Sequence, residues 1–138
     1  MKSELSTLNV FVYGTLKPGE ANFAPYCQDK ISSQTPAYTW GELYALSLGY
    51  PAMTTGKNKI QGVILALKNW QVLQDLDRLE GYQVNRPAEL NEYDRTLVTV
   101  YGAGDRQLGQ AWAYYMTLEK VRQYGGTKVN SGCWTGGK

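Results

Sequence analysis

The sequence of this 138-residue chain contains one helical pattern and about five strand patterns, which limits the possible folds. Neighbouring parallel strands need a crossover of about a dozen residues or more, usually a helix. The segments between these strand patterns are too short for regular crossovers of that kind. A mixed or antiparallel sheet that closes into a small barrel therefore fits the sequence best.

The expected strands are rich in β-branched and aromatic residues and end at glycine, proline or asparagine. They cover residues 8–13, 38–46, 60–67, 93–101 and 108–116. The third is nearly continuous and apolar, which suits a strand covered on both faces. Pro18 and Gly19 indicate a loop after the first strand, leading to a short helix before Cys27. Aromatic residues form 12% of the chain and include eleven tyrosines, enough to fill a small barrel and line a pocket.

Length and charge favour one compact domain over residues 1–138, because no linker, repeat or low-complexity tract divides the chain. The 14 basic and 12 acidic residues are spread along it, so a nucleic acid partner is not indicated. No apolar run approaches the roughly 20 residues of a membrane span. Residues 1–9 lack a signal-peptide core, so we expect a cytoplasmic protein without a membrane partner. The sequence does not indicate an oligomeric state.

Histidine is absent from the chain, which excludes several kinds of catalytic site. Ser-His-Asp and Cys-His nucleophile systems both need histidine, as do histidine metal sites. Cys27 and Cys133 are far apart and form no CxxC motif, so neither a zinc site nor a dithiol redox site is indicated. We expect two free thiols. Any chemistry must use other groups.

Glu80 places a carboxylate on the apolar face of the expected helix. Asn69 is a plausible N-cap and Gly81 a plausible C′ residue, so Glu80 lies in the last turn. At about 100° per residue, Glu80 falls on the same side as the apolar residues Val72, Leu73, Leu76 and Leu79. Burial and the negative end of the helix dipole both raise the pKa of such a carboxyl, which makes it a candidate proton acceptor in catalysis. The alternative is a terminal glutamate that bends into solvent.

The second candidate feature is the turn Tyr13-Gly14-Thr15-Leu16, where the first strand ends. Successive main-chain N–H groups in such a turn form an anion-binding concavity. Gly14 has no side chain, so a ligand carboxylate can approach closely. The alternative is an ordinary strand-to-loop turn, because Gly-Thr turns are common. The GxxxxGK[ST] spacing of a phosphate-binding P-loop is missing.

Other polar residues near these features have simpler explanations. Asp77 faces nearly the same side of the helix as Glu80, and paired carboxylates are typical of glycosidases. Nothing else suggests a sugar substrate, so we expect Asp77 to form a surface salt bridge or a local hydrogen bond. Core packing or surface pairing explains Tyr82, Arg95 and Tyr115 at least as well as a place beside a pocket.

Five blocks of the chain, in the same order, resemble the γ-glutamylcyclotransferase-like family, which includes γ-glutamylamine cyclotransferases and AIG2-like proteins. The first block is residues 10–19 (VFVYGTLKPG) with Asn22. The later blocks are residues 41–44 (GELY) with 49–52 (GYPA), 76–82 (LDRLEGY), 93–95 (YDR) and 131–134 (SGCW). The agreement spans essentially the whole chain. Cys133 stands where many relatives have aspartate, which concerns the contacts of Trp134 more than the chemistry.

The resemblance implies an α+β fold, a small closed β-barrel of about five to seven mixed strands with a few short flanking helices. It implies an enzyme that cyclises a γ-glutamylamine or γ-glutamyl peptide to 5-oxoproline and releases an amine or amino acid, without a metal or organic cofactor. Glu80 would be the general acid/base. The glutamyl carboxylate would bind at the turn formed by Tyr13, Gly14, Thr15 and Leu16. The rival is a non-catalytic module that binds a small γ-glutamyl-like metabolite on the same fold.

Overall fold

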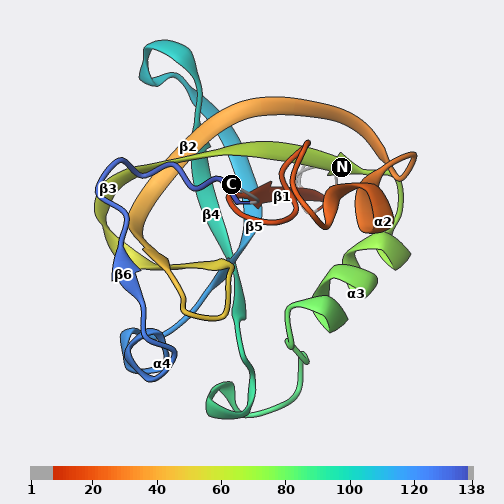
Figure 1. Cartoon of the computed structure of the whole chain (residues 1–138). Helices are drawn as coiled ribbons and strands as arrows, with labels where there is room; N and C mark the ends of the chain where they lie inside the picture. The colour runs from red at the N-terminus through yellow and green to blue at the C-terminus, as the bar shows by residue number, and fades with distance from the viewer. Residues whose placement is uncertain (1–7, 137–138) are drawn as a thin grey trace.

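The computed structural model describes residues 8–136, which form a curved mixed sheet with short helices beside it (Figure 1). The elements in chain order are β1 (Asn9–Val12), α2 (Phe23–Cys27), β2 (Ile31–Ala45), β3 (Pro51–Leu67), α3 (Trp70–Leu79), η1 (Ala88–Leu90), β4 (Asp94–Tyr101), η2 (Ala103–Asp105), β5 (Gln107–Tyr115), α4 (Leu118–Gln123) and β6 (Thr127–Lys128).

The sheet curls into a barrel-like ring. Its six strands pair in the order β3-β1-β5-β4-β2-β6, and a further pairing of β3 with β2 joins the ring. Most neighbours are antiparallel, but β1 runs parallel to β5, with Val10 beside Trp112. Strand β2 also pairs with β4, where Tyr38 lies opposite Tyr101. The predicted α+β fold with a mixed sheet is confirmed.

The hairpin of β2 and β3 is much longer than predicted. We expected strands over residues 38–46 and 60–67, whereas the paired strands begin at Ile31 and Pro51. Polar residues dominate the added segments, so only pairing with the partner strand makes them extended. Helix α4 and strand β6 were also not predicted, because each is too short to show a period.

Helix α3 forms as the sequence predicts and packs against the sheet. The side chain of Asn69 accepts a hydrogen bond from the main-chain N–H of Val72, which caps the first turn. Gly81 follows the helix with a φ of +71°, the left-handed conformation of a C′ glycine. The buried face of the helix joins Val10, Val12 and further residues of the sheet in one apolar cluster. Glu80 is thereby held at the end of a firmly packed helix.

Strand β1 lies between two apolar clusters. Val10 and Val12 pack into the cluster that contains α3, whereas Phe11 and Tyr13 pack into a second cluster with residues of β2 to β5. Successive side chains of a strand point to opposite faces, so β1 is covered on both sides. The end of β1 is therefore fixed in position, and with it the turn that begins at Tyr13.

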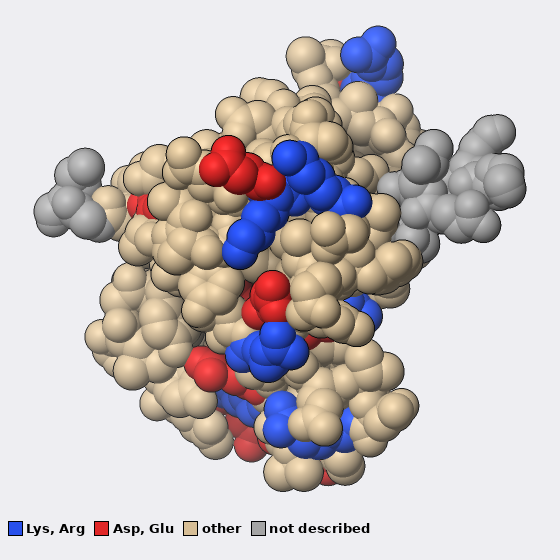
Figure 2. All heavy atoms as spheres, turned by 90° about the vertical axis from the view of Figure 1, so that its right-hand side faces the viewer, with Lys and Arg blue, Asp and Glu red and all other residues tan. Residues whose placement is uncertain are grey.

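Charged side chains of both signs are interspersed on the face shown in Figure 2. Cys27 is buried and Cys133 is exposed, and both are free thiols, as predicted. None of the helices within residues 8–136 combines the length and the apolar character that a membrane span requires.

Candidate functional site

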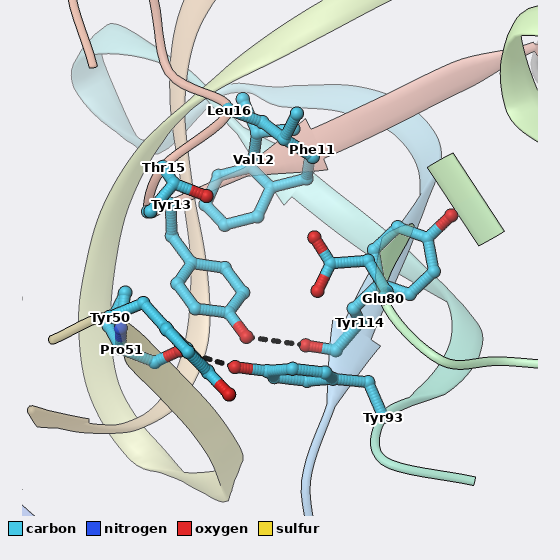
Figure 3. A pocket seen from close by; sticks show the side chains of 11 residues that line it. Phe11, Val12, Tyr13, Thr15, Leu16, Tyr50, Pro51, Glu80, Tyr93 and Tyr114 are labelled. Carbon is cyan, nitrogen blue, oxygen red and sulfur yellow. Dashed lines mark hydrogen bonds between the residues drawn. The ribbon is translucent and has the colours of Figure 1, made fainter. Parts of the chain in front are cut away.

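A pocket lies between the end of β1, the start of β3 and the end of α3 (Figure 3). All four residues of the predicted turn line it, and so does Glu80. The structure thus brings together the two features that the sequence singled out, although 63 residues and two long strands separate Leu16 from Glu80 along the chain. Tyr50, Pro51, Tyr93 and Tyr114 complete most of the remaining wall.

The turn at the end of β1 is held by hydrogen bonds of its side chains. The hydroxyl of Tyr13 donates to the main-chain oxygen of Tyr114 at 2.6 Å and accepts from the main-chain N–H of Met53 at 3.1 Å. The hydroxyl of Thr15 accepts from the side-chain amide of Asn22 at 3.0 Å. Tyr13 is thus a buried support for the turn.

Within residues 8–136, the main-chain N–H groups of Gly14, Thr15 and Leu16 donate no hydrogen bond to another main-chain group. All three residues line the pocket. Unpaired successive N–H groups at a turn are a favourable setting for an anion.

The carboxylate of Glu80 points into the space that Phe11, Tyr13 and Tyr93 surround (Figure 3). Its main-chain N–H donates to Leu76 at the end of the helix. Burial is the largest cause that raises the pKa of Glu80, to about 8, and the negative charges of Glu92 and Asp77 add to it. The pKa of Glu80 is thus raised, as the sequence predicts. Besides burial, two neighbouring carboxylates contribute to the rise.

Asp77 is buried, so the expectation of a surface salt bridge is wrong. One carboxylate oxygen accepts from the hydroxyl of Tyr114 at 2.7 Å, and the other accepts from the guanidinium of Arg95 at 2.9 Å. The side chains of Asp77 and Arg95 are each 12% exposed. Asp77 lies on the face of α3 that packs on the sheet, which is why it finds partners on β4 and β5.

Several residues of the site were missed by sequence reasoning. The hydroxyl of Tyr50 donates to Glu92 at 2.7 Å, and that of Tyr93 donates to the main-chain oxygen of Pro51 at 2.7 Å. Tyr50, Pro51 and Tyr93 belong to blocks of the family resemblance, which was the available signal. No sequence signal marked Tyr114, because it is one of several aromatic and apolar residues in β5.

The tyrosines of the wall stay protonated. Burial is the main cause that raises the pKa of Tyr13, Tyr93 and Tyr114 far above the usual value. Their hydroxyls therefore act as hydrogen-bond donors over the whole physiological range. Glu80 is then the group of the pocket whose charge changes near neutral pH.

We expect Glu80 to make the stability of the protein depend on pH. Its pKa is about 8 in the folded chain and 4.5 ordinarily, so between these values the folded state holds a proton that the unfolded state releases. Stability therefore falls as the pH rises through this window. Glu80→Gln should remove this fall, so that the free energy of unfolding of the variant gains about 4 kcal/mol over that of the wild type between pH 5 and pH 9. Urea unfolding of both proteins at the two pH values measures the difference, and parallel pH dependences would contradict it.

Comparison with known proteins identifies the family of the chain. A family model described as γ-glutamyl cyclotransferase, AIG2-like, matches residues 10–136. Among curated proteins, no sequence is significantly similar to the chain.

Solved structures with the same fold come from bacteria, animals and archaea. YkqA from Bacillus subtilis is 24% identical with a TM-score of 0.64, over 91% of this chain and 39% of that one. An AIG2-like protein from Mus musculus is 20% identical with a TM-score of 0.67, over 93% and 88% of the two chains. An uncharacterised protein from Pyrococcus horikoshii is 17% identical with a TM-score of 0.58, over 92% and 89%. The chain thus spans well under half of YkqA but most of the other two.

The structural neighbours show the fold. The family model matches all but the ends of the sequence and shows the family. The chain belongs to the AIG2-like γ-glutamyl cyclotransferase family.

Proposed function

We propose that this protein is a γ-glutamylcyclotransferase-type enzyme, which converts a γ-glutamyl amide to 5-oxoproline and releases an amine or an amino acid. The observation that carries the proposal is the position of Glu80. A carboxyl with a pKa of about 8 faces the same pocket as a turn with unpaired N–H groups. These are the two components that an intramolecular cyclisation of a γ-glutamyl group requires.

The substrate supplies its own nucleophile in this reaction. The α-amine attacks the γ-carbonyl carbon, a C–N bond forms, and the five-membered ring closes through a tetrahedral intermediate. The former amide bond then breaks, and its nitrogen leaves as an amine. No serine, cysteine or histidine is needed, which is consistent with a chain that contains no histidine.

Glu80 is the group we assign to the proton transfers. As a carboxylate it takes a proton from the α-ammonium or from the attacking amine, and as a carboxylic acid it returns one to the leaving nitrogen. Raising the pKa of Glu80 brings it closer to that of the substrate's α-ammonium group, which lowers the free-energy cost of passing a proton between them. A solvated glutamate would be too weak a base for the first step.

The turn formed by Tyr13, Gly14, Thr15 and Leu16 is the proposed site for the α-carboxylate of the substrate. Binding there would hold the flexible glutamyl chain with its amine and its γ-carbonyl near Glu80, which favours the bent conformer that ring closure needs. Thr15 and Glu80 line both this pocket and an adjoining one that Asn22 and Glu92 also border. The leaving group would extend into that second space.

The alternative to an enzyme is a binding module that holds a γ-glutamyl-like metabolite without converting it. The same turn and the same fold serve both functions, and the difference rests on Glu80. A panel of γ-glutamyl peptides and γ-glutamylamines distinguishes them, with 5-oxoproline release and thermal stabilisation measured side by side. Release of 5-oxoproline from at least one substrate supports the enzyme. Stabilisation by several ligands without any release would favour the binding module.

A further inference from the structure

Tyr114 connects the two halves of the pocket. Its main-chain oxygen accepts the hydrogen bond from Tyr13, the first residue of the turn, as the dashed line in Figure 3 shows. Its hydroxyl donates to Asp77, which lies one helical turn before Glu80 on α3. A single residue of β5 therefore holds both the proposed carboxylate site and the helix that carries the proposed base.

Arg95 forms the outer part of the same network. Its guanidinium donates to the second carboxylate oxygen of Asp77 and lies 4.5 Å from the ring centre of Trp112 and 5.2 Å from that of Tyr82. Two rings and a buried carboxylate thus fix the cation in place. A buried ion pair contributes little net stability relative to apolar residues, so stability alone does not account for this pair beside the proposed site.

We infer that Asp77 and Arg95 are positioning residues for the proposed cyclisation, on which this inference rests, and that together they hold Glu80 against the turn and set how readily it binds a proton. Neither lines the pocket, so each would influence a bound substrate only through Glu80 or the turn. Asp77 acts directly on Glu80 through its charge, and through Tyr114 it fixes the end of the helix. Arg95 acts on Glu80 by offsetting the charge of Asp77.

The groups around Glu80 determine the direction of each effect. Those that face it are Asp77 on α3, Glu92 and Tyr93 before β4, Tyr13 after β1, Tyr50 before β3 and Tyr114 on β5. The tyrosines are neutral, whereas Asp77 and Glu92 are negative and disfavour a charged Glu80. Arg95 pairs with Asp77 and opposes that influence. Removing Asp77's charge should therefore help Glu80 to ionise, and removing Arg95's charge should hinder it.

The pH dependence of kcat tests these opposite effects. In the wild type, kcat should fall at low pH as Glu80 becomes protonated. Asp77→Asn should move this acid limb to lower pH by about one pH unit, and Arg95→Gln should move it to higher pH by a similar amount. Asp75→Asn is the matched control, because Asp75 pairs with Arg78 on the exposed side of the same helix. It should leave the limb in place.

The variant Tyr114→Phe distinguishes the effect of the network on the position of Glu80 from its effect through charge. This variant keeps both charges but removes the hydroxyl that holds Asp77, so kcat should fall about tenfold with the acid limb unmoved. If Arg95→Gln does not fold, the double variant Asp77→Asn with Arg95→Gln replaces it, and its limb should lie near that of the wild type. A limb that stays in place in both single variants, or moves in the same direction in both, would overturn the inference.

The titration of the Glu80 carboxyl by ¹³C NMR needs no turnover and separates this inference from the proposed function. Opposite shifts of its titration midpoint in Asp77→Asn and Arg95→Gln support the network of Asp77 and Arg95. If the same proteins convert no γ-glutamyl amide, only the proposed reaction is rejected. Turnover by the wild type with an unmoved midpoint in both variants would reject the network alone.

Discussion

Glu80→Gln is expected to lower kcat for 5-oxoproline formation about a thousandfold, with little change in KM. The glutamine has nearly the same shape but neither accepts the proton of the substrate amine nor returns it to the leaving nitrogen. General acid–base catalysis by one residue typically contributes a factor of about 10² to 10⁴. Steady-state measurement of 5-oxoproline release at saturating substrate gives kcat directly, and thermal shift shows whether the variant still binds the substrate.

Glu89→Gln is the matched control for that variant, because Glu89 is an exposed glutamate of η1 that lines neither half of the proposed site. Its kcat should equal that of the wild type. Near-normal turnover by Glu80→Gln would mean that another group moves the proton, and the role assigned to Glu80 would be wrong.

Gly14→Ala is expected to weaken substrate binding strongly. A Cβ atom at this position would lie 2.6 Å from Cγ and 2.9 Å from Cδ of Pro51, closer than real carbon atoms approach. The ring of Pro51 is stiff, so the turn and the start of β3 must move apart. We expect KM to rise tenfold or more as the N–H groups shift, with a loss of about 1–3 kcal/mol in the free energy of unfolding.

Gly19→Ala separates binding from stability in that experiment. Gly19 lies in the same loop with a φ of +90°, and a Cβ there would meet no atom within 4 Å. This variant should lose stability through backbone strain, by about 1 kcal/mol, while its KM stays unchanged. An unchanged KM in Gly14→Ala would contradict the proposed role of the turn. KM values for one γ-glutamyl substrate and urea unfolding of the three proteins measure both effects.

The sequence predicted those parts of the fold that depend on local patterns. Asn69 and Gly81 bound α3 because capping is decided within a few residues, and the apolar stripe of that helix fixed which face it buries. Tyr13 and Gly14 marked the end of β1 for the same reason. The extension of β2 to Ile31 was not predictable, because polar residues become strands there only through their partners on β3.

The candidate site was predictable only in its two named features. Glu80 was conspicuous because a charge interrupts an apolar face, and the turn because glycine ends a strand. Their proximity came from the family resemblance, since no local pattern relates residues so far apart. The buried pair of Asp77 and Arg95 was missed because the helical wheel shows which side Asp77 faces, whereas the position of β4 decides whether that side is open to water.

In the proposed reaction, the substrate's own amine attacks the γ-carbonyl with Glu80 as proton carrier, and water takes no part. The most direct test is the conversion of a γ-glutamyl amide in H₂¹⁸O, with the products analysed by mass spectrometry. We expect the wild type to form 5-oxoproline without ¹⁸O, together with the free amine, and Glu80→Gln to form at most a trace. Glutamate carrying ¹⁸O as the first product would show that water is the nucleophile and would rule out the proposed cyclisation.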